Sequence, residues 1–317
     1  MADQTTGATG FEVTDTDPGQ PGTTVPGPAD AGTTVPGPAD AGTTAPDPAG
    51  AAPTPGPGGF GRSRSQGMAG GAEFPQLQTE TVERFGRPMR HFPVAVTSEA
   101  MALAWANQEE APDGATVIVD TEIRPSGLHG RLWKVPAADS LACSIVLRPV
   151  LKMDEADCLW LAAAWAAAEG AERVSGRPLS TWWPDSIVDS ATREQVAAVR
   201  AEIQLGPGRV KSAILTLRFD LPGLGLDASR KDELLEAVLS AVDAASEELT
   251  GGAVAAAAAY EKRCALLGTR VMIRLLPKGE TRGTARRIDR AARLELESPS
   301  GLIEKIGVDQ VRDMKVV

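Results

Sequence analysis

A glycine-containing stretch between two expected strands gathers the side chains best suited to binding a ligand. The strands are predicted at Thr116–Val119 and Leu141–Leu147, from their apolar, β-branched character. A connection this long is either disordered or shaped to hold something. It carries two glycines and five donor side chains, namely Gly127, Gly130, Arg124, His129, Arg131, Trp133 and Lys134. Donors set among glycines suit a backbone that closes over an anionic or flat ligand.

A second stretch with candidate binding residues is LSTWWPDSIVD, at residues 179–189. Asp185 could accept a hydrogen bond from a ligand amide or ribose, or only cap the following turn. Trp133 and Trp183 are either a platform for a ligand or part of the core. Arg131 is either a ligand contact or a surface residue with a solvated head. His129 fits an ordinary loop histidine better than a general acid or base. The residues leave these alternatives open.

The elements that must position these residues follow from periodicity and turn signals. Helices are expected at about 98–110, 155–172, 230–249 and 254–266. The segment 191–202 fits a helix by composition, but the turn at 206–208 and the run 211–221 favour a hairpin of two strands. Short alternating strands are expected over 269–317.

Composition separates the N-terminus from the rest. Residues 1–72 are rich in Gly, Pro, Ala and Thr, and the unit AGTTVPGPAD repeats with a ten-residue period. Such a segment buries too little apolar surface to offset its chain entropy, so we expect a disordered tail. Its role is not evident from the sequence.

The totals exclude several classes of protein. A formal charge of -10 and a pI near 4.9 argue against a nucleic-acid partner. No apolar run is long enough to span a membrane, and no secretory signal is visible, so we expect a cytoplasmic protein. Three scattered cysteines, Cys143, Cys158 and Cys264, fit reduced, buried residues. Two histidines and no paired cysteines make a metal site unexpected.

The loop resembles the ligand loop of the biotin protein ligases, which reads G-R-G-R-x-G-R-x-W. Over Pro125–Trp133, Gly127, Gly130, Arg131 and Trp133 match, whereas Ser126 and Leu128 stand at arginine positions. The resemblance covers about residues 92–317.

Three further segments resemble the same family with altered residues. In its K-W-P-N-D-I signature, Trp183 matches, Trp182 replaces the lysine and Asp185 replaces the asparagine. The following strand has Gln195 in place of a lysine. TLRFD resembles the family's G-I-G-I-N strand, with Thr216, Arg218 and Asp220 replacing its polar and glycine positions. The end of the chain resembles the family's SH3-like barrel.

The resemblance implies an α/β (α+β) fold. We expect a mixed sheet flanked by helices in a ligase-like domain at 73–266, a small SH3-like barrel at 267–317, and the disordered tail at 1–72. The implied reaction converts biotin and ATP, with Mg, to biotinyl-AMP and pyrophosphate, and then transfers biotin to a lysine of a carboxylase carrier domain with release of AMP. It needs no protein nucleophile and depends on cations that bind the phosphates.

Four of the family's cationic positions are lost here, so we expect a degenerate adenylation site in a weakly active or inactive binding or regulatory module. Substitute cations could come from Arg124, Lys134, Lys211 or Arg218. An active biotin or lipoate ligase with rearranged cations is one alternative. The other is a structural partner-binding protein whose pocket is filled by Leu128 and Trp182. The catalytic residues, the ligand and the oligomeric state are not specified by the sequence.

Overall fold

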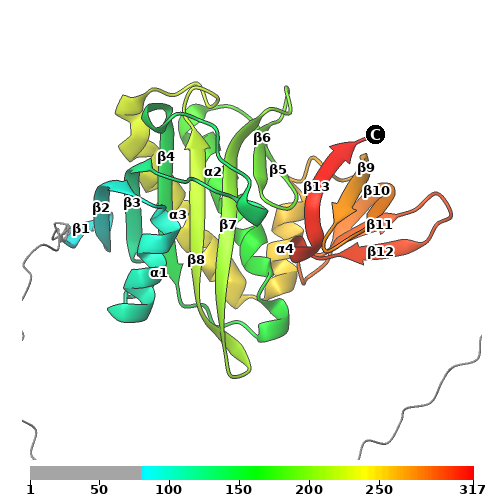
Figure 1. The fold of residues 1–317 in the computed structure, drawn as a ribbon, viewed down its shortest axis with the longest axis horizontal. Coiled ribbons are helices and arrows are strands. Elements are labelled where there is room, and N and C mark those ends of the chain that lie inside the picture. The colour runs from blue at the N-terminus through cyan, green and yellow to red at the C-terminus, as the bar shows by residue number, and fades with distance from the viewer. Residues whose placement is uncertain (1–79) are drawn as a thin grey trace, which may run out of the picture. The chain divides into compact units, whose positions relative to one another are not determined.

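Two β-sheets organise the part of the chain that the structure describes, residues 80–317 of a computed structural model (Figure 1). The expected tail at 1–72 and the first residues of the expected ligase-like domain, 73–79, lie outside these residues. The first sheet has eight strands in the order β1-β2-β3-β4-β8-β7-β6-β5, and the second has five in the order β12-β11-β10-β9-β13. The chain therefore has the mixed α/β architecture that the sequence predicts.

In the first sheet all neighbouring strands are antiparallel except the parallel pair β2 and β3. Its strands are β1 (Val82–Arg84), β2 (Arg87–Ala95), β3 (Thr116–Glu122), β4 (Ser140–Leu147), β5 (Leu179–Trp182), β6 (Ser186–Asp189), β7 (Gln195–Gly206) and β8 (Arg209–Asp220). The segment 191–202 is thus part of a long hairpin, not a helix. The expected strands on either side of the glycine loop are β3 and β4.

Helices cover both faces of the first sheet. Helix α1 (Ser98–Gln108) begins where Thr97 caps the backbone N–H of Ala100, and it packs on one face through Trp105. Helices α2 (Cys158–Ser175) and α3 (Lys231–Thr250) pack on the opposite face, against residues such as Leu217. In Figure 1, α1 lies in front of the sheet and α2 and α3 lie behind it. The two faces of the sheet therefore belong to two separate hydrophobic clusters.

Helix α4 (Ala253–Glu261) is shorter than the helix expected at 254–266. The chain leaves the helix because its next residues pair with the edge strand β5. The Thr181 N–H donates to the Arg263 carbonyl and the Ala265 N–H donates to the Thr181 carbonyl, both at 2.9 Å. These bonds satisfy an edge that would otherwise be open, and periodicity along one segment could not reveal them.

The second sheet contains β9 (Arg270–Leu275), β10 (Glu280–Ile288), β11 (Leu294–Glu297), β12 (Ile303–Ile306) and β13 (Val311–Val316), all antiparallel to their neighbours. Hydrogen bonds tie it to the preceding residues, and two of them come from residues far apart in the sequence. The Trp183 indole donates to the Ala292 carbonyl at 2.9 Å, and the Ile288 N–H donates to Glu261 at 2.7 Å. The SH3-like barrel and the domain boundary at 266 stay predictions.

The cysteines have the environments that the sequence indicates. Cys143, Cys158 and Cys264 are unpaired and buried. Burial raises the pKa of Cys143 and of Cys158 to about 12, so both thiols are protonated near neutral pH. None of the helices in the described residues is long and apolar enough to cross a membrane.

We expect Gly170→Ala to destabilise the protein by about 1–3 kcal/mol. An added Cβ at this position of α2 would lie 2.6 Å from the Cα of Val238 in α3, so the two helices would have to separate. The matched control is Gly206→Ala, whose Cβ would make an ordinary 3.5 Å contact with Lys211. Urea unfolding of both variants checks this, and equal stabilities would show that the helices do not constrain each other at Gly170.

Candidate functional site

The glycine loop of residues 123–139 is a folded hairpin. Ser126 and Leu132 form an antiparallel bridge, and the Gly127 N–H donates to the Arg131 carbonyl at 2.7 Å. Its tip is a short 3-10 turn, Leu128–Gly130, in which His129 and Gly130 have positive φ angles of 52° and 74°. Glycine adopts such angles without strain, which accounts for Gly130. The sequence left disorder and a shaped loop open, and the structure shows a shaped loop.

Two arginines from the sheet bind the backbone of this loop. The Arg218 guanidinium donates to the Ser126 carbonyl at 3.1 Å, and that of Arg200 donates to the Gly127 carbonyl at 3.4 Å. Arg218 belongs to β8 and Arg200 to β7, and the two strands are adjacent. The loop is therefore held against the sheet by side chains that rise from the sheet itself.

A buried ion pair lies beneath the loop. Arg218 donates to the two carboxylate oxygens of Glu122 at 2.6 and 3.1 Å, and the side chains are only 2% and 4% exposed. The backbone N–H and hydroxyl of Ser98, at the start of α1, also donate to Glu122, at 2.6 and 2.9 Å. The bidentate geometry and the extra donors offset much of the cost of burying two charges.

The network continues across the sheet through hydroxyl groups. The Ser144 hydroxyl donates to the Ser98 hydroxyl at 2.9 Å, and it lies 2.8 Å from the Thr216 hydroxyl. Ser144, on β4, and Thr216, on β8, are opposite each other in the register, and both are fully buried. The face of the sheet below the loop is therefore polar, and its polar side chains form hydrogen bonds with one another.

Arg200 is neutralised in the same way as Arg218. It lies 3.1 Å from Glu99 of α1 and 3.3 Å from Glu202 of its own strand. Burial raises the pKa of the Glu99 carboxyl, an effect that Arg200 opposes and Glu202 reinforces. Both arginines that contact the loop thus have acidic partners.

Arg131, the one loop arginine that matches the biotin ligase motif, binds Asp185. Asp185 is almost fully buried, whereas Arg131 is half exposed. Behind them, the Ser186 hydroxyl donates to Asp185 at 3.3 Å and the Gln195 amide donates to the Ser186 hydroxyl at 2.9 Å. The structure thus brings together Arg131, Asp185 and Gln195 from three separate segments.

The tryptophans have different surroundings. Trp133 is half-buried at the base of the loop, where its indole donates to the Ser140 hydroxyl at 3.0 Å. Trp183 is fully buried, and its indole is bonded to Ala292, so this side chain belongs to the core and not to a ligand platform. Trp182 is half-buried, with the Arg193 guanidinium 5.7 Å from its ring centre.

The expected substitute cations do not converge on one site. Arg218 is already bound to Glu122. Lys211 lies seven residues before it on β8, at about 3.3 Å per residue, so the two are about 23 Å apart. Arg124 and Lys134 are exposed on the loop and form no ion pair with any residue in 80–317. Lys211 therefore cannot compensate at the loop, and Arg124 and Lys134 are the remaining candidates.

The space under the loop is small. A cavity of about 90 Å³ lies between β3, β4 and the loop, and Glu122, Trp133 and Ser140 are among its lining residues. Pockets that enclose small molecules usually measure roughly 300–1,000 Å³. In this conformation the cavity holds a few atoms of a ligand at most. Within residues 80–317 no cluster of three or more His, Cys, Asp or Glu side chains could hold a metal ion.

Sequence reasoning missed the acidic half of this site, namely Glu99, Glu122 and Glu202, together with Arg200 and the paired hydroxyls. One signal was available. Thr216 and Arg218 alternate with apolar residues along β8, which places both on one face of the strand. The partners on β3 and α1 carry no such signal because they meet β8 only in the folded chain.

We expect Glu122→Gln to cost about 3–5 kcal/mol of unfolding free energy, because it leaves a buried arginine without a counter-charge. The double variant Glu122→Met with Arg218→Leu should lose less unfolding free energy than Glu122→Met alone or Arg218→Leu alone. Urea unfolding of the full double-mutant cycle checks this coupling. The exposed pair Glu280–Arg282 is the matched control, with an expected effect below about 1 kcal/mol. Strictly additive effects at Glu122 and Arg218 would contradict the assignment.

We also expect the stability gain of Glu99→Gln over the native protein to grow as the pH rises from 4 to 7. Because the folded-state pKa of Glu99 is raised, the folded protein binds this proton more tightly than the unfolded chain. Its contribution to stability is present at low pH and is lost as the pH rises through that pKa. Glutamine does not titrate. Parallel pH profiles of unfolding for the two proteins would show that Glu99 ionises without penalty.

Curated relatives of this chain are bifunctional ligase/repressor proteins. The BirA of Bacillus subtilis (strain 168) is 26% identical over 178 residues, which cover 55% of this chain and 51% of the relative. The BirA of Bacillus spizizenii is 25% identical over the same length. The chain thus spans about half the length of the curated relatives it matches. No family model matches the chain.

Solved structures share the fold. A biotin protein ligase from Aquifex aeolicus in complex with biotin and ATP matches with a TM-score of 0.58 and 16% identity, over 72% of this chain and 99% of that one. A biotin protein ligase-like protein of unknown function from Silicibacter sp. TM1040 matches with a TM-score of 0.53 and 13% identity, over 70% and 95%. Over this part of its length the chain is thus similar in sequence to the BirA proteins and similar in fold to biotin protein ligases.

Proposed function

We propose that this chain has lost the capacity to adenylate biotin and acts as a binding or regulatory module built on a biotin ligase-like scaffold. The observation that carries the proposal is the pairing of charges at the loop. Arg131, Arg200 and Arg218 each have a carboxylate partner from the described residues. The loop is closed over these pairs, with little space beneath it.

Adenylation requires positive charge that is free to bind the phosphates of ATP and the carboxylate of biotin. Removing one preorganised donor of this kind typically slows catalysis by about 10²–10³. At the positions where the resemblance places lysines, this chain has Trp182 and Gln195. The carboxylate of Asp185 is linked to Gln195 through the Ser186 hydroxyl, and it would repel a phosphate whenever Arg131 left it.

The floor of the pocket supports the same conclusion on steric grounds. In the resemblance, Thr216 and Arg218 align with a strand that contains two glycines. A glycine on a sheet leaves room for a ligand to approach the backbone, whereas an arginine fills that room. Here the Arg218 side chain extends from the strand to Glu122 and to the loop carbonyl. Glu122 and Arg218 thus occupy part of this space. Leu128, which we considered from the sequence as a filler together with Trp182, is buried as well.

A biotin carrier domain of a carboxylase is the partner that the family resemblance supports best. A module that has lost adenylation could still bind the carrier surface, because that surface does not depend on ATP. Such a protein would compete with an active ligase for the unmodified carrier.

The second candidate is an active ligase that uses Arg124 and Lys134. The observation in its favour is that both cations lie on the loop without an acidic partner among residues 80–317. It requires the loop to open, so that Arg131 leaves Asp185 and new cations approach the phosphates. It also predicts that Arg131→Ala removes any turnover.

We expect the purified chain to release no pyrophosphate above background when it is mixed with ATP, Mg, biotin and a carrier domain. The ligase from Aquifex aeolicus under the same conditions is the positive control. The Arg124→Gln and Lys134→Gln variants should be as inactive as the native chain. Steady pyrophosphate release that falls in these variants would establish the second candidate and end the first.

Carrier binding is tested separately, by calorimetric titration of the chain with an unmodified carrier domain. We expect binding that does not change when ATP and biotin are added, because the filled pocket gives them no part in it. Binding of biotin or ATP is tested by thermal shift. A ligand present at 100 times its Kd would raise the free energy of unfolding by about 2.7 kcal/mol, which such a measurement detects. Stabilisation by biotin or ATP alone would show that the pocket opens.

A further inference from the structure

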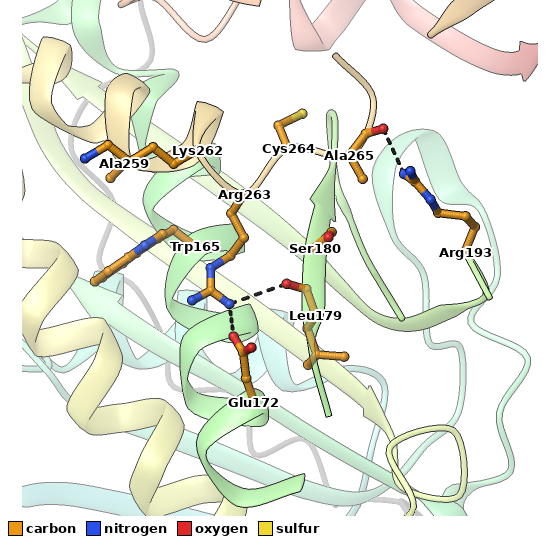
Figure 2. Close-up of a pocket in the computed structure, with 10 residues that line it drawn as sticks. All are labelled: Trp165, Glu172, Leu179, Ser180, Arg193, Ala259, Lys262, Arg263, Cys264 and Ala265. Atoms are coloured by element: carbon orange, nitrogen blue, oxygen red, sulfur yellow. Dashed lines mark hydrogen bonds and ion pairs between the residues drawn. The ribbon is translucent and has the colours of Figure 1, made fainter. Parts of the chain in front are cut away.

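A second candidate site is distinct from the loop site in the residues that line it. It is an open groove of about 680 Å³ between α2, β5 and the residues that follow α4 (Figure 2). This volume is within the usual range for ligand pockets, roughly 300–1,000 Å³. Its walls combine an aromatic ring, cationic side chains and small apolar residues. None of the residues placed in the loop site lines it.

The groove carries more hydrogen-bond donors than acceptors. Lys262 is exposed and forms no ion pair with residues 80–317. Arg193 donates one N–H to the Ala265 carbonyl at 2.8 Å and has no acidic partner in that part of the chain. The half-exposed Trp165 likewise has no described acceptor for its indole N–H. In a chain of net charge -10, a pocket with unmatched positive charge departs from the rest of the surface.

The third cation of the groove, Arg263, is structural. It donates to Glu169 at 2.7 Å and binds Glu172, and its remaining contact is the Leu179 carbonyl at 3.4 Å. Figure 2 shows its guanidinium pointing down to Glu172, with Trp165 and Lys262 on one side and Arg193 on the other. Because Arg263 uses both nearby carboxylates, Lys262 and Arg193 are left without them.

Arg193 is held in its position by a tightly built turn. Its φ of 65° is unusual for a residue other than glycine, and such strain persists only where the surroundings enforce it. Asp189 provides that support, since its carboxylate accepts the N–H groups of Ala191 and Thr192 at 2.9 and 3.0 Å. These N–H groups lower the pKa of Asp189, and Arg177 adds to the effect. Asp189 thus stays ionised near neutral pH, and the turn that it supports stays intact.

The remaining lining is apolar or neutral. Leu179, Ala259, Ala265 and Cys264 are among its lining residues. Burial raises the pKa of Cys264, so the thiol is protonated and acts as an apolar contact. A ligand that suits this lining has a flat or aliphatic body and supplies acceptors at one end.

We propose that this groove binds a small organic carboxylate, with its body against Trp165 and its carboxylate on Lys262 or Arg193. Charge-assisted hydrogen bonds from ammonium and guanidinium groups to a carboxylate supply the affinity. The flat indole supplies contact area at low entropic cost. The site is separate from the loop, so it is independent of the proposed function.

The test is a titration of the full chain, labelled with nitrogen-15, with benzoate as the probe. The indole N–H signal of Trp165 is followed by NMR and is assigned with the Trp165→Phe variant. We expect a saturable shift of this signal with benzoate and none with benzamide, which has the same shape without the charge. Lys262→Gln or Arg193→Asn should weaken binding by about fivefold or more. Asparagine is chosen at position 193 because it tolerates the positive φ of that residue.

The control variant is Lys211→Gln. It removes an exposed lysine near the start of β8 that does not line the groove, and it should leave benzoate binding unchanged. Three results would overturn the proposal. One is the absence of a saturable shift up to millimolar benzoate, and another is an equal response to benzamide. The third is binding that Lys262→Gln and Arg193→Asn together leave at the native strength.

Discussion

The buried pair of Glu122 and Arg218 is the interaction on which the loop site depends. Both side chains are almost fully excluded from water, so each needs the other and cannot be removed alone without a large cost. Glu122 also accepts a hydrogen bond from Ser98 at the start of α1, and Arg218 also donates one to the Ser126 carbonyl of the loop. One ion pair therefore joins β3, β8, α1 and the loop.

In this arrangement, groups of the protein itself bind the arginines at the loop. A pocket that binds an anionic substrate needs cations that are free until the substrate arrives. Here the carboxylates of Glu99, Glu122 and Asp185 are already in contact with the arginines that the loop and sheet present. The loop can close without any substrate, because its carbonyl oxygens already have donors.

Much of the fold could be predicted from the sequence, and the reasons are local. The strands β3 and β4 are apolar runs, and the turn between β7 and β8 contains two glycines, so pattern and turn chemistry agree. The end of α4 was placed wrongly because it is set by pairing between Thr181 and residues 263–265. That pairing joins segments about eighty residues apart, and the periodicity of one segment carries no information on it.

The candidate site was predictable only in part, for a related reason. The loop residues were identified from their types and spacing, and in the folded loop Arg131 binds Asp185 and Trp133 binds Ser140. Counting cations along the sequence, however, does not show which are neutralised. Arg218 was a candidate substitute cation until its partner on β3 was known, and the sequence left Trp183 open between a ligand platform and the core, where it is buried.

If adenylation has been lost, as we propose, the same ion pair would make it difficult to regain. Restoring space and free charge under the loop requires both Glu122 and Arg218 to be replaced. The first replacement alone would cost about 3–5 kcal/mol, out of a total stability that is typically about 5–15 kcal/mol. Each path between a filled and an open pocket therefore passes through a poorly stable protein. A charged filler makes the change of function harder to reverse than an apolar filler would, because a truncated apolar residue leaves no unpaired charge behind.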